Sequence, residues 1–261
     1  MMVRTPRRLP PLAAALLAAA CGSASPSSSS STSASASRIG DSPTQTVHHA
    51  LSALSQRGFD VTFREVARLR LAGVPPAHTG ALRTALRGAA LSETGVVHFT
   101  SVRQFRATFS SSRSGTAHVK VSGGRFLVSI NGGGYRGATA VERRVLTAFV
   151  HGGFSFVSPP ARHVEDRGPR VVNGAAVEEY TASFSAGAIA SQFSPFVQLP
   201  PHTSIAGGTT TLDIDRATGL PVHISDVVSL TTDLAAVRPG LTGRLITTAT
   251  STRTFRFDPP R

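Results

Sequence analysis

Cysteine, tryptophan, tyrosine and lysine are scarce or absent in this sequence. Its 261 residues include one cysteine, Cys21, two tyrosines and no tryptophan. A single cysteine excludes an intramolecular disulfide and a multi-cysteine metal site. Lysine is also scarce, since Lys120 is the only one among 27 basic residues, against 14 acidic residues and a net charge of +13. This charge suits an anionic partner, but the arginines are spread along the chain, which favours a solvated positive surface.

The apolar segment at the N-terminus is too short to span a membrane. Leu12–Cys21 is half as long as the roughly 20 residues that a transmembrane helix needs. It follows Arg4, Arg7 and Arg8 and ends in small residues. A basic start, a short apolar stretch and small residues before a cleavage point are typical of a secretory signal peptide.

The end of this segment resembles the processing site of bacterial lipoproteins. Ala19, Ala20 and Cys21 fit that site, although Ala18 stands where leucine is usual. In such proteins the cysteine becomes the first mature residue and carries acyl chains such as palmitate. The resemblance implies a signal peptide over residues 1–20, a lipid attached at Cys21 and anchoring on the extracytoplasmic face of the cell membrane. Export argues against nucleic acid as a partner.

Residues 21–41 are predicted to form a tether. Ser27–Ser31 and the Ser/Ala alternation that follows contain too little apolar surface to fold. A chain of this composition behaves as a flexible coil. Ordered structure is expected from Ser42 onward, as a single domain over residues 42–261.

Alternation of apolar and polar residues in this domain predicts an antiparallel sheet with one buried face. Gly123-Gly124 and Asn173-Gly174 are typical of tight hairpin turns. We expect helices at Pro43–Arg57, Ala140–Val150 and Ala186–Val197, and a short helix at Ala81–Leu91. Loops are expected at Gly73–Gly80 and Leu199–Gly208, and a turn at Asp215–Gly219.

Three stretches together resemble actinobacterial lipoproteins with a LolA/LolB-like, or LppX/LprG-like, domain. They are RVVNGAAVEEYTASF, TTTLDIDRATGLPVHISD and the threonine-rich C-terminal strand. Gly174 and Tyr180 match the first motif, Asp215 and Gly219 match the hairpin motif, and His223 stands where a basic residue is usual. The resemblance implies an α+β fold in which helices pack on the concave face of a strongly curved antiparallel sheet, a half-barrel. Such proteins often hold acyl chains in an apolar cavity between sheet and helices.

The residues that we expect to line such a cavity are apolar residues that alternate with polar ones along the predicted strands. They are Phe59, Phe63, Phe99, Phe105, Phe126, Val128, Tyr180, Phe184, Leu212 and Ile214. Ile189, Phe193 and Phe196 are candidates for a lid, although they also fit an ordinary core. The protein would then bind or carry a lipid or another apolar ligand. A structural or sensory envelope lipoprotein without a small ligand remains the alternative.

Catalytic and cofactor motifs are weak throughout the sequence. Asn131–Gly137, NGGGYRG, lacks the lysine and spacing of a Walker loop and is expected to be a glycine-rich loop after a strand. Asp213 and Asp215 share a strand face, as in a cation site, but a polar outer face and a turn aspartate explain both. Glu178 and Glu179 point to opposite faces and cannot form an acid–base pair. We therefore expect no enzyme activity, no metal and no cofactor.

Overall fold

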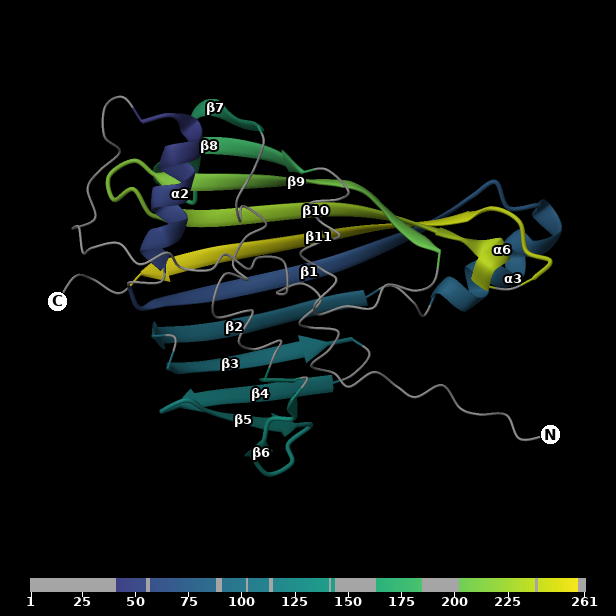
Figure 1. Ribbon diagram of the computed structural model, residues 1–261, viewed down its shortest axis with the longest axis horizontal. Coiled ribbons are helices and arrows are strands. Elements are labelled where there is room, and N and C mark those ends of the chain that lie inside the picture. The colour runs from purple at the N-terminus through teal and green to yellow at the C-terminus, as the bar shows by residue number, and fades with distance from the viewer. Residues whose placement is uncertain are drawn as a thin grey trace.

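The computed structural model describes residues 41–54, 57–87, 91–101, 103–112, 115–140, 142–143, 163–184, 202–237 and 239–257. Its strands form one antiparallel sheet of 11 strands in the order β6-β5-β4-β3-β2-β1-β11-β10-β9-β8-β7 (Figure 1). Their bounds are β1 Phe59–Ala72, β2 Leu91–Ser101, β3 Gln104–Ser111, β4 Gly115–Ser122, β5 Arg125–Ile130, β6 Arg136–Gly137, β7 His163–Val172, β8 Ala175–Phe184, β9 Thr203–Asp215, β10 Pro221–Asp233 and β11 Arg244–Phe257. The predicted antiparallel sheet is confirmed, and the described residues are mostly β.

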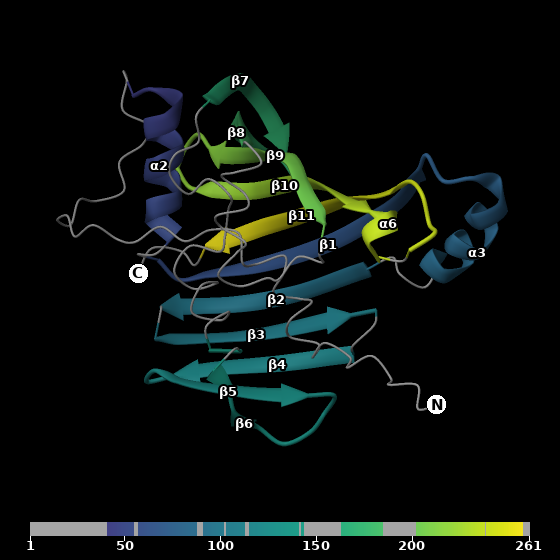
Figure 2. The ribbon, with the colours of Figure 1, turned by 45° about the vertical axis from the view of Figure 1, so that its right-hand side comes forward.

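The first and last strands lie side by side at the centre of the sheet. β1 and β11 pair from Phe59 and Phe257 at one end to Ala72 and Arg244 at the other. β2 to β6 continue the sheet on one side and β10 to β7 on the other (Figures 1 and 2). The two halves of the chain therefore share one sheet.

The two predicted hairpin turns connect their strands as expected. Asn173 and Gly174 join β7 to β8 with φ angles of 50° and 84°. Gly123 and Gly124 join β4 to β5 with φ angles of 56° and 80°. Positive φ at both central residues is the geometry that matches the twist of paired strands, and asparagine and glycine tolerate it best.

The predicted strong curvature of the sheet is wrong, and the helices are fewer and shorter than an α+β fold implies. The sheet is open and twisted rather than strongly curled, and its edge strands, β6 and β7, lie at opposite sides (Figure 2). Curling a sheet requires bulges or glycine kinks. The three central ladders, β2–β1, β1–β11 and β11–β10, contain no register shift. The described shifts lie outside these ladders, so the centre of the sheet extends without a sharp bend.

Helix α2 (Pro43–Leu54) confirms the first predicted helix. The Ser42 hydroxyl accepts a hydrogen bond from the backbone N of Gln45 at 3.4 Å, and Gln45 Oε1 accepts one from the backbone N of Ser42 at 2.8 Å. This reciprocal pair is a capping box. Pro43 takes the first helical position, where its missing N–H is not needed. The helix lies across one end of the strands (Figure 1).

Helix α3 (Pro76–Arg87) begins earlier than predicted, so the loop expected at Gly73–Gly80 is wrong over most of its length. The carbonyl of Pro75 accepts two backbone hydrogen bonds from the first turn. Proline suits this turn because its fixed φ is already helical. α3 and the short α6 (Leu234–Val237) lie at the opposite end of the sheet from α2 (Figure 2). No helix in the described ranges is long and apolar enough to cross a membrane.

The other two predicted helices lie mainly outside the described residues. The start of Ala140–Val150 is visible as a second capping box. Glu142 Oε2 accepts a hydrogen bond from the backbone N of Thr139 at 2.7 Å, and the Thr139 hydroxyl accepts one from the backbone N of Glu142 at 3.2 Å. Ala186–Val197 falls entirely outside the described ranges.

Strand β9 is longer than predicted, so the loop expected at Leu199–Gly208 is wrong from Thr203 onward. Gly207 and Gly208 pair with β10, and a register shift falls next to Gly207, between Ser229 and Leu230. Glycine inside a strand often marks such a bulge. The two glycines therefore interrupt the pairing of β9 without ending the strand.

Candidate functional site

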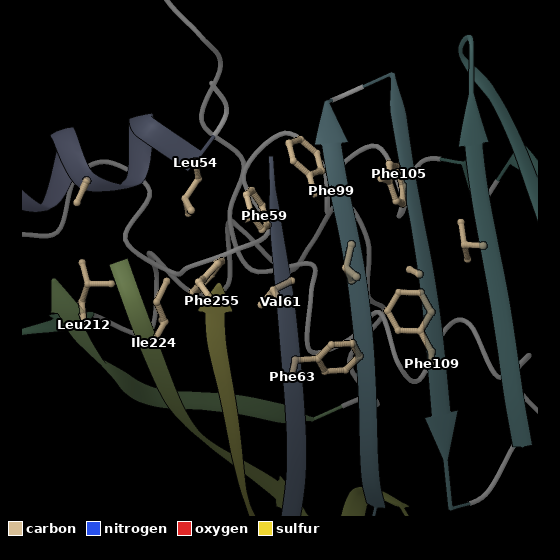
Figure 3. Packing of buried hydrophobic residues seen from close by; sticks show 14 of the residues in the cluster. Leu54, Phe59, Val61, Phe63, Phe99, Phe105, Phe109, Leu212, Ile224 and Phe255 are labelled. Atoms are coloured by element: carbon tan, nitrogen blue, oxygen red, sulfur yellow. The ribbon is translucent and has the colours of Figure 1, made fainter. Parts of the chain in front are cut away.

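Aromatic side chains gather on one face of the sheet, which we call the inner face. Phe59 stacks on Phe99 with ring centroids 4.8 Å apart and meets Phe255 edge-on at 5.6 Å (Figure 3). Phe63 and Phe109 pack 5.4 Å apart. These five side chains are at most 5% exposed. Stacked and edge-on rings at these distances attract one another in addition to burying apolar surface.

The absence of a side chain at Gly95 allows Phe63 to adopt this position. Gly95 and Phe63 are partners in the register of β1 and β2. A Cβ atom at Gly95 would overlap the Phe63 ring and lie 2.7 Å from the backbone oxygen of Thr108. Glycine inside a strand is typical of such a close approach. The ring of Phe63 therefore crosses β2 and reaches Phe109 on β3 (Figure 3).

Helix α2 covers one end of the inner face. Val47, Ala50 and Leu54 are buried and belong to the same apolar cluster as Phe59. Their spacing places them on one side of the helix. Leu54 lies beside Phe59 (Figure 3).

Most residues predicted to line a cavity lie together in this cluster. Eight of them are buried there: Phe59, Phe63, Phe99, Phe105, Val128, Tyr180, Leu212 and Ile214. Phe126 is partly buried against the cluster. The side chain of Phe184 lies outside the described part of the chain, as do Cys21 and the lid candidates Ile189, Phe193 and Phe196. That these residues line a ligand cavity stays a prediction.

A row of polar residues crosses the same face, two positions along β1 from Phe63. It comprises Glu93, Glu65, Ser251, Asp226 and Thr210, which are successive register partners on β2, β1, β11, β10 and β9. All five are buried, and Glu93 and Asp226 are 0% and 1% exposed. Burying a carboxyl group is costly unless it is hydrogen-bonded or paired. We call this set the carboxyl row.

One half of the carboxyl row is internally paired. Arg253 of β11 is 3% exposed and donates a hydrogen bond to Asp226 Oδ2. The Thr210 hydroxyl donates to Asp226 Oδ1 at 2.5 Å. A buried ion pair is stable only when such additional hydrogen bonds complete it. Both oxygens of Asp226 are therefore satisfied.

The other half of the row is not paired. Glu65 Oε2, both carboxyl oxygens of Glu93 and the Ser251 hydroxyl have no hydrogen-bond partner among the described residues. Burial raises the pKa of Glu65 to about 8, with a further rise from Glu93 and an opposing effect of Arg253. Burial also raises the pKa of Glu93 to about 7, against the lowering influence of the Ser111 hydroxyl. Two carboxyl groups with unused hydrogen-bonding capacity thus lie within an apolar face.

The cation site considered for Asp213 and Asp215 is not supported, because both residues have other partners. Arg170 donates from Nε to Asp213 Oδ1 at 2.9 Å and from a terminal nitrogen to Oδ2 at 2.6 Å, and His223 Nδ1 lies 3.1 Å from Oδ2. Burial acts to raise the pKa of Asp213, but the hydrogen bonds from His223 and Arg170 hold it below its usual value. Asp215 Oδ1 accepts a hydrogen bond from the backbone N of Thr218 at 2.8 Å, which closes the turn. In the described ranges, no group of three or more His, Cys, Asp or Glu side chains is arranged to hold a metal ion.

Residues 131–135 of the glycine-rich segment form a loop after β5, as expected, and its last two residues form the short strand β6 (Arg136–Gly137). Asn131 Oδ1 accepts a hydrogen bond from the backbone N of Thr116 at 2.9 Å. The Ser129 hydroxyl donates to the carbonyl of Gly133 at 2.5 Å. These contacts fasten the loop to its own hairpin, which supports the structural interpretation over a phosphate loop.

The sequence contains a signal for the carboxyl row that the prediction overlooked. Glu65 occupies the same period-two phase as Phe63, and Asp226 the same phase as Ile224. A charged residue in the apolar phase of a strand indicates a buried polar site. Glu93 could not be placed because β2 begins at Leu91, inside the segment expected to be helical.

Comparisons with known proteins assign no family to the chain. No family model and no curated protein matches it. The similar solved structures include LprF from Mycobacterium bovis, with a TM-score of 0.46 and 12% identity over 84% of this chain and 94% of that chain. The lipoprotein LppX from Mycobacterium tuberculosis has a TM-score of 0.38 and 9% identity, covering 84% and 97% of the two chains. A putative outer membrane lipoprotein-sorting protein domain from Vibrio parahaemolyticus has a TM-score of 0.23 and 7% identity over 84% and 93%. TM-scores below 0.5 do not establish a shared function, so a function for this chain has to be inferred from its own residues.

Proposed function

We propose that this protein is an extracytoplasmic lipoprotein, anchored to the cell membrane through Cys21, that binds or carries a lipid or another apolar ligand. The ligand lies on the inner face of the sheet, and no catalysis or cofactor is involved. The observation that carries this proposal is the combination of a phenylalanine cluster with buried carboxyl oxygens of Glu65 and Glu93 that have no hydrogen-bond partner among the described residues. A core that served only for stability would have little use for such groups, because each unsatisfied polar atom costs free energy.

The extent of the apolar cluster supports this location for the ligand. Helix α2 lies close to β7 and β9 and reaches Phe59 through Leu54 (Figure 3). Phe63 and Phe109 lie farther along their strands than α2 extends (Figure 3). An acyl chain in contact with these rings would gain about 25 cal/mol for each Å² of apolar surface removed from water.

The N-terminal segment supports a role close to a membrane. A flexible coil of the length of residues 21–41 reaches roughly 25 Å between its ends. The domain would therefore stay within reach of the bilayer that holds Cys21. This arrangement suits a protein that takes apolar molecules from a membrane or delivers them to it.

Native mass spectrometry of the protein purified from its own host tests the proposal. We expect a bound species whose mass corresponds to a lipid and which organic extraction releases. Phe126→Arg places a charge at the edge of the apolar cluster and should eliminate that species. The matched control is Tyr135→Arg, which changes a 57% exposed side chain in the loop before β6 and should leave lipid binding intact.

Two outcomes would contradict the proposal. One is wild-type protein from its own host without any extractable apolar molecule, which would leave the structural or sensory lipoprotein as the better interpretation. The other is a folded Phe126→Arg variant, with an unchanged thermal unfolding midpoint, that retains the bound lipid at the wild-type level.

A further inference from the structure

Three carboxyl oxygens on the inner face make no hydrogen bond to the described residues, although the Ser111 hydroxyl lies near enough to Glu93 to lower its pKa. These oxygens are Glu65 Oε2 and both oxygens of Glu93. Glu93 is fully buried and Glu65 is 5% exposed. A buried carboxyl group without hydrogen bonds is costly, so its retention calls for a partner beyond the described residues.

The Arg253 guanidinium is already engaged with another carboxylate of the row. It lowers the pKa of Glu65 through its charge, and it donates a hydrogen bond to Asp226. With all carboxyl groups ionised, Glu65, Glu93, Asp226 and Arg253 would carry a net charge of two minus. In this ionised state the site attracts hydrogen-bond donors and positive charge, and it repels anions.

The unpartnered carboxyl groups lie next to the aromatic cluster. Glu65 is two residues from Phe63 on β1, and Glu93 is two residues from Gly95 on β2, so all four positions face the same side of the sheet. Phe63 in turn packs against Phe109. A ligand with an apolar tail along these rings would place its polar end at Glu65 and Glu93.

We propose that Glu65 and Glu93 bind the head group of an amphiphile, and that this head group carries hydrogen-bond donors, either ammonium or hydroxyl. The inference rests on the proposed function, since the tail of the same ligand occupies the inner face. It adds the chemical class of the ligand, because an ionised carboxylate accepts hydrogen bonds but donates none, and therefore favours head groups that carry donors. An ammonium group would form the stronger, charge-assisted bonds.

A protonation change should accompany binding. Near neutral pH, burial keeps Glu65, whose pKa is about 8, largely protonated and Glu93, whose pKa is about 7, partly protonated. A donor that hydrogen-bonds to the ionised form lowers the pKa, so binding should release protons to the solvent. Calorimetry in buffers of different ionisation enthalpy measures this release.

The test is isothermal titration calorimetry of the full-length chain with Cys21→Ser, using four dodecyl amphiphiles below their micelle concentrations. Dodecylammonium offers cationic donors and dodecyl maltoside offers neutral hydroxyl donors. Dodecyltrimethylammonium is a cation without donors, and dodecanoate is an anion without donors. We expect at least one donor-bearing head group to bind roughly tenfold or more tightly than both donor-free ones, the difference expected from one hydrogen bond to a charged group.

Replacing Glu65 and Glu93 locates the effect. Glu65→Gln and Glu93→Gln keep the side-chain shape but remove the ionisable group, so each should reduce the head-group preference and the proton release. Glu165→Gln is the matched control, because it makes the same change on a 60% exposed side chain of β7. This control should bind all four amphiphiles as the wild type does.

The outcomes separate the two proposals. If all four amphiphiles bind the wild type with equal affinity, the tail site exists and the head-group inference is overturned. If none binds, the proposed function is overturned together with it. A preference that persists unchanged in folded Glu65→Gln and Glu93→Gln proteins would place head-group recognition elsewhere and refute the assignment to these residues. The comparison of the four amphiphiles on the wild-type protein tests the head-group inference even if a variant does not fold.

Discussion

Glu65 and Glu93 stand directly opposite each other on β1 and β2, both on the inner face and both buried. Side chains at such positions have Cβ atoms about 5 Å apart, close enough for their charges to interact strongly. The charge of Glu93 therefore opposes the ionisation of Glu65, in addition to the effect of burial. This pair connects the stability of the fold to pH.

The free energy of unfolding should fall as the pH rises from about 5 to about 8. The pKa of Glu65 is raised from 4.5 to about 8 and that of Glu93 from 4.5 to about 7, while Asp226 and Arg253 face the same pair. Over this window the folded protein binds more protons than the unfolded chain, so ionisation favours unfolding. Each group contributes a slope of at most about 1.4 kcal/mol per pH unit.

Urea denaturation between pH 5 and pH 8 measures this slope. Glu65→Gln should flatten it, because glutamine does not ionise and the contribution of Glu65 to the slope is lost. Glu165→Gln, with its exposed side chain, should keep the wild-type slope. A wild-type stability that is constant or rises over this pH range would contradict the assignment of the two raised pKa values.

Gly95→Ala should destabilise the protein by about 1–3 kcal/mol. The new Cβ atom would overlap the Phe63 ring and approach the backbone oxygen of Thr108, which cannot move without disturbing β3. Gly80→Ala is the control, because nothing lies within 4 Å of its Cβ and the residue lies inside helix α3. It should be neutral or stabilising by up to about 1 kcal/mol. Equal thermal unfolding midpoints for the two variants would disprove the close contact between Phe63 and β2.

Arg253→Met should cost about 3–5 kcal/mol of folding free energy, because it leaves the buried Asp226 carboxylate without its cation. The double variant Arg253→Met, Asp226→Asn should recover a large part of that loss, since no uncompensated charge remains. Chemical denaturation of the wild type, both single variants and the double variant gives the coupling energy. Additive effects of the two substitutions would show that the pair is not coupled in solution.

Cys21→Ser should abolish acyl labelling and release the protein from the membrane fraction. Stable anchoring requires more than one acyl chain, and all of them depend on this cysteine in the predicted lipoprotein. Metabolic labelling with a fatty acid, followed by detergent phase partition, measures both effects. Retention of the label on the Cys21→Ser protein would refute the predicted lipid attachment.

Local signals in the sequence predicted the local structure well. The start of helix α2 after Ser42 and the hairpin turn at Asn173-Gly174 depend on residues within a few positions of one another. Such features are decided by backbone conformation and nearby hydrogen bonds, which the sequence displays directly. The glycine-rich segments were predicted less well. Gly207 and Gly208 were expected in a loop, but they lie inside strand β9, where the pairing with β10 shifts next to them.

The sequence by itself determined which residues turn the chain, where α2 begins and which side of each strand is apolar. These features follow from short-range conformational preferences and from the alternation of apolar and polar residues along a strand. Only the tertiary structure decided that Glu65, Glu93 and Asp226 meet in one row, because strands far apart in the chain had to pair in a particular register. It also decided that the sheet stays open, because curvature depends on where bulges fall between paired strands. The candidate site belongs to this second group: its carboxyl groups are ordinary strand residues until the pairing of β1 with β2 and β11 buries them together.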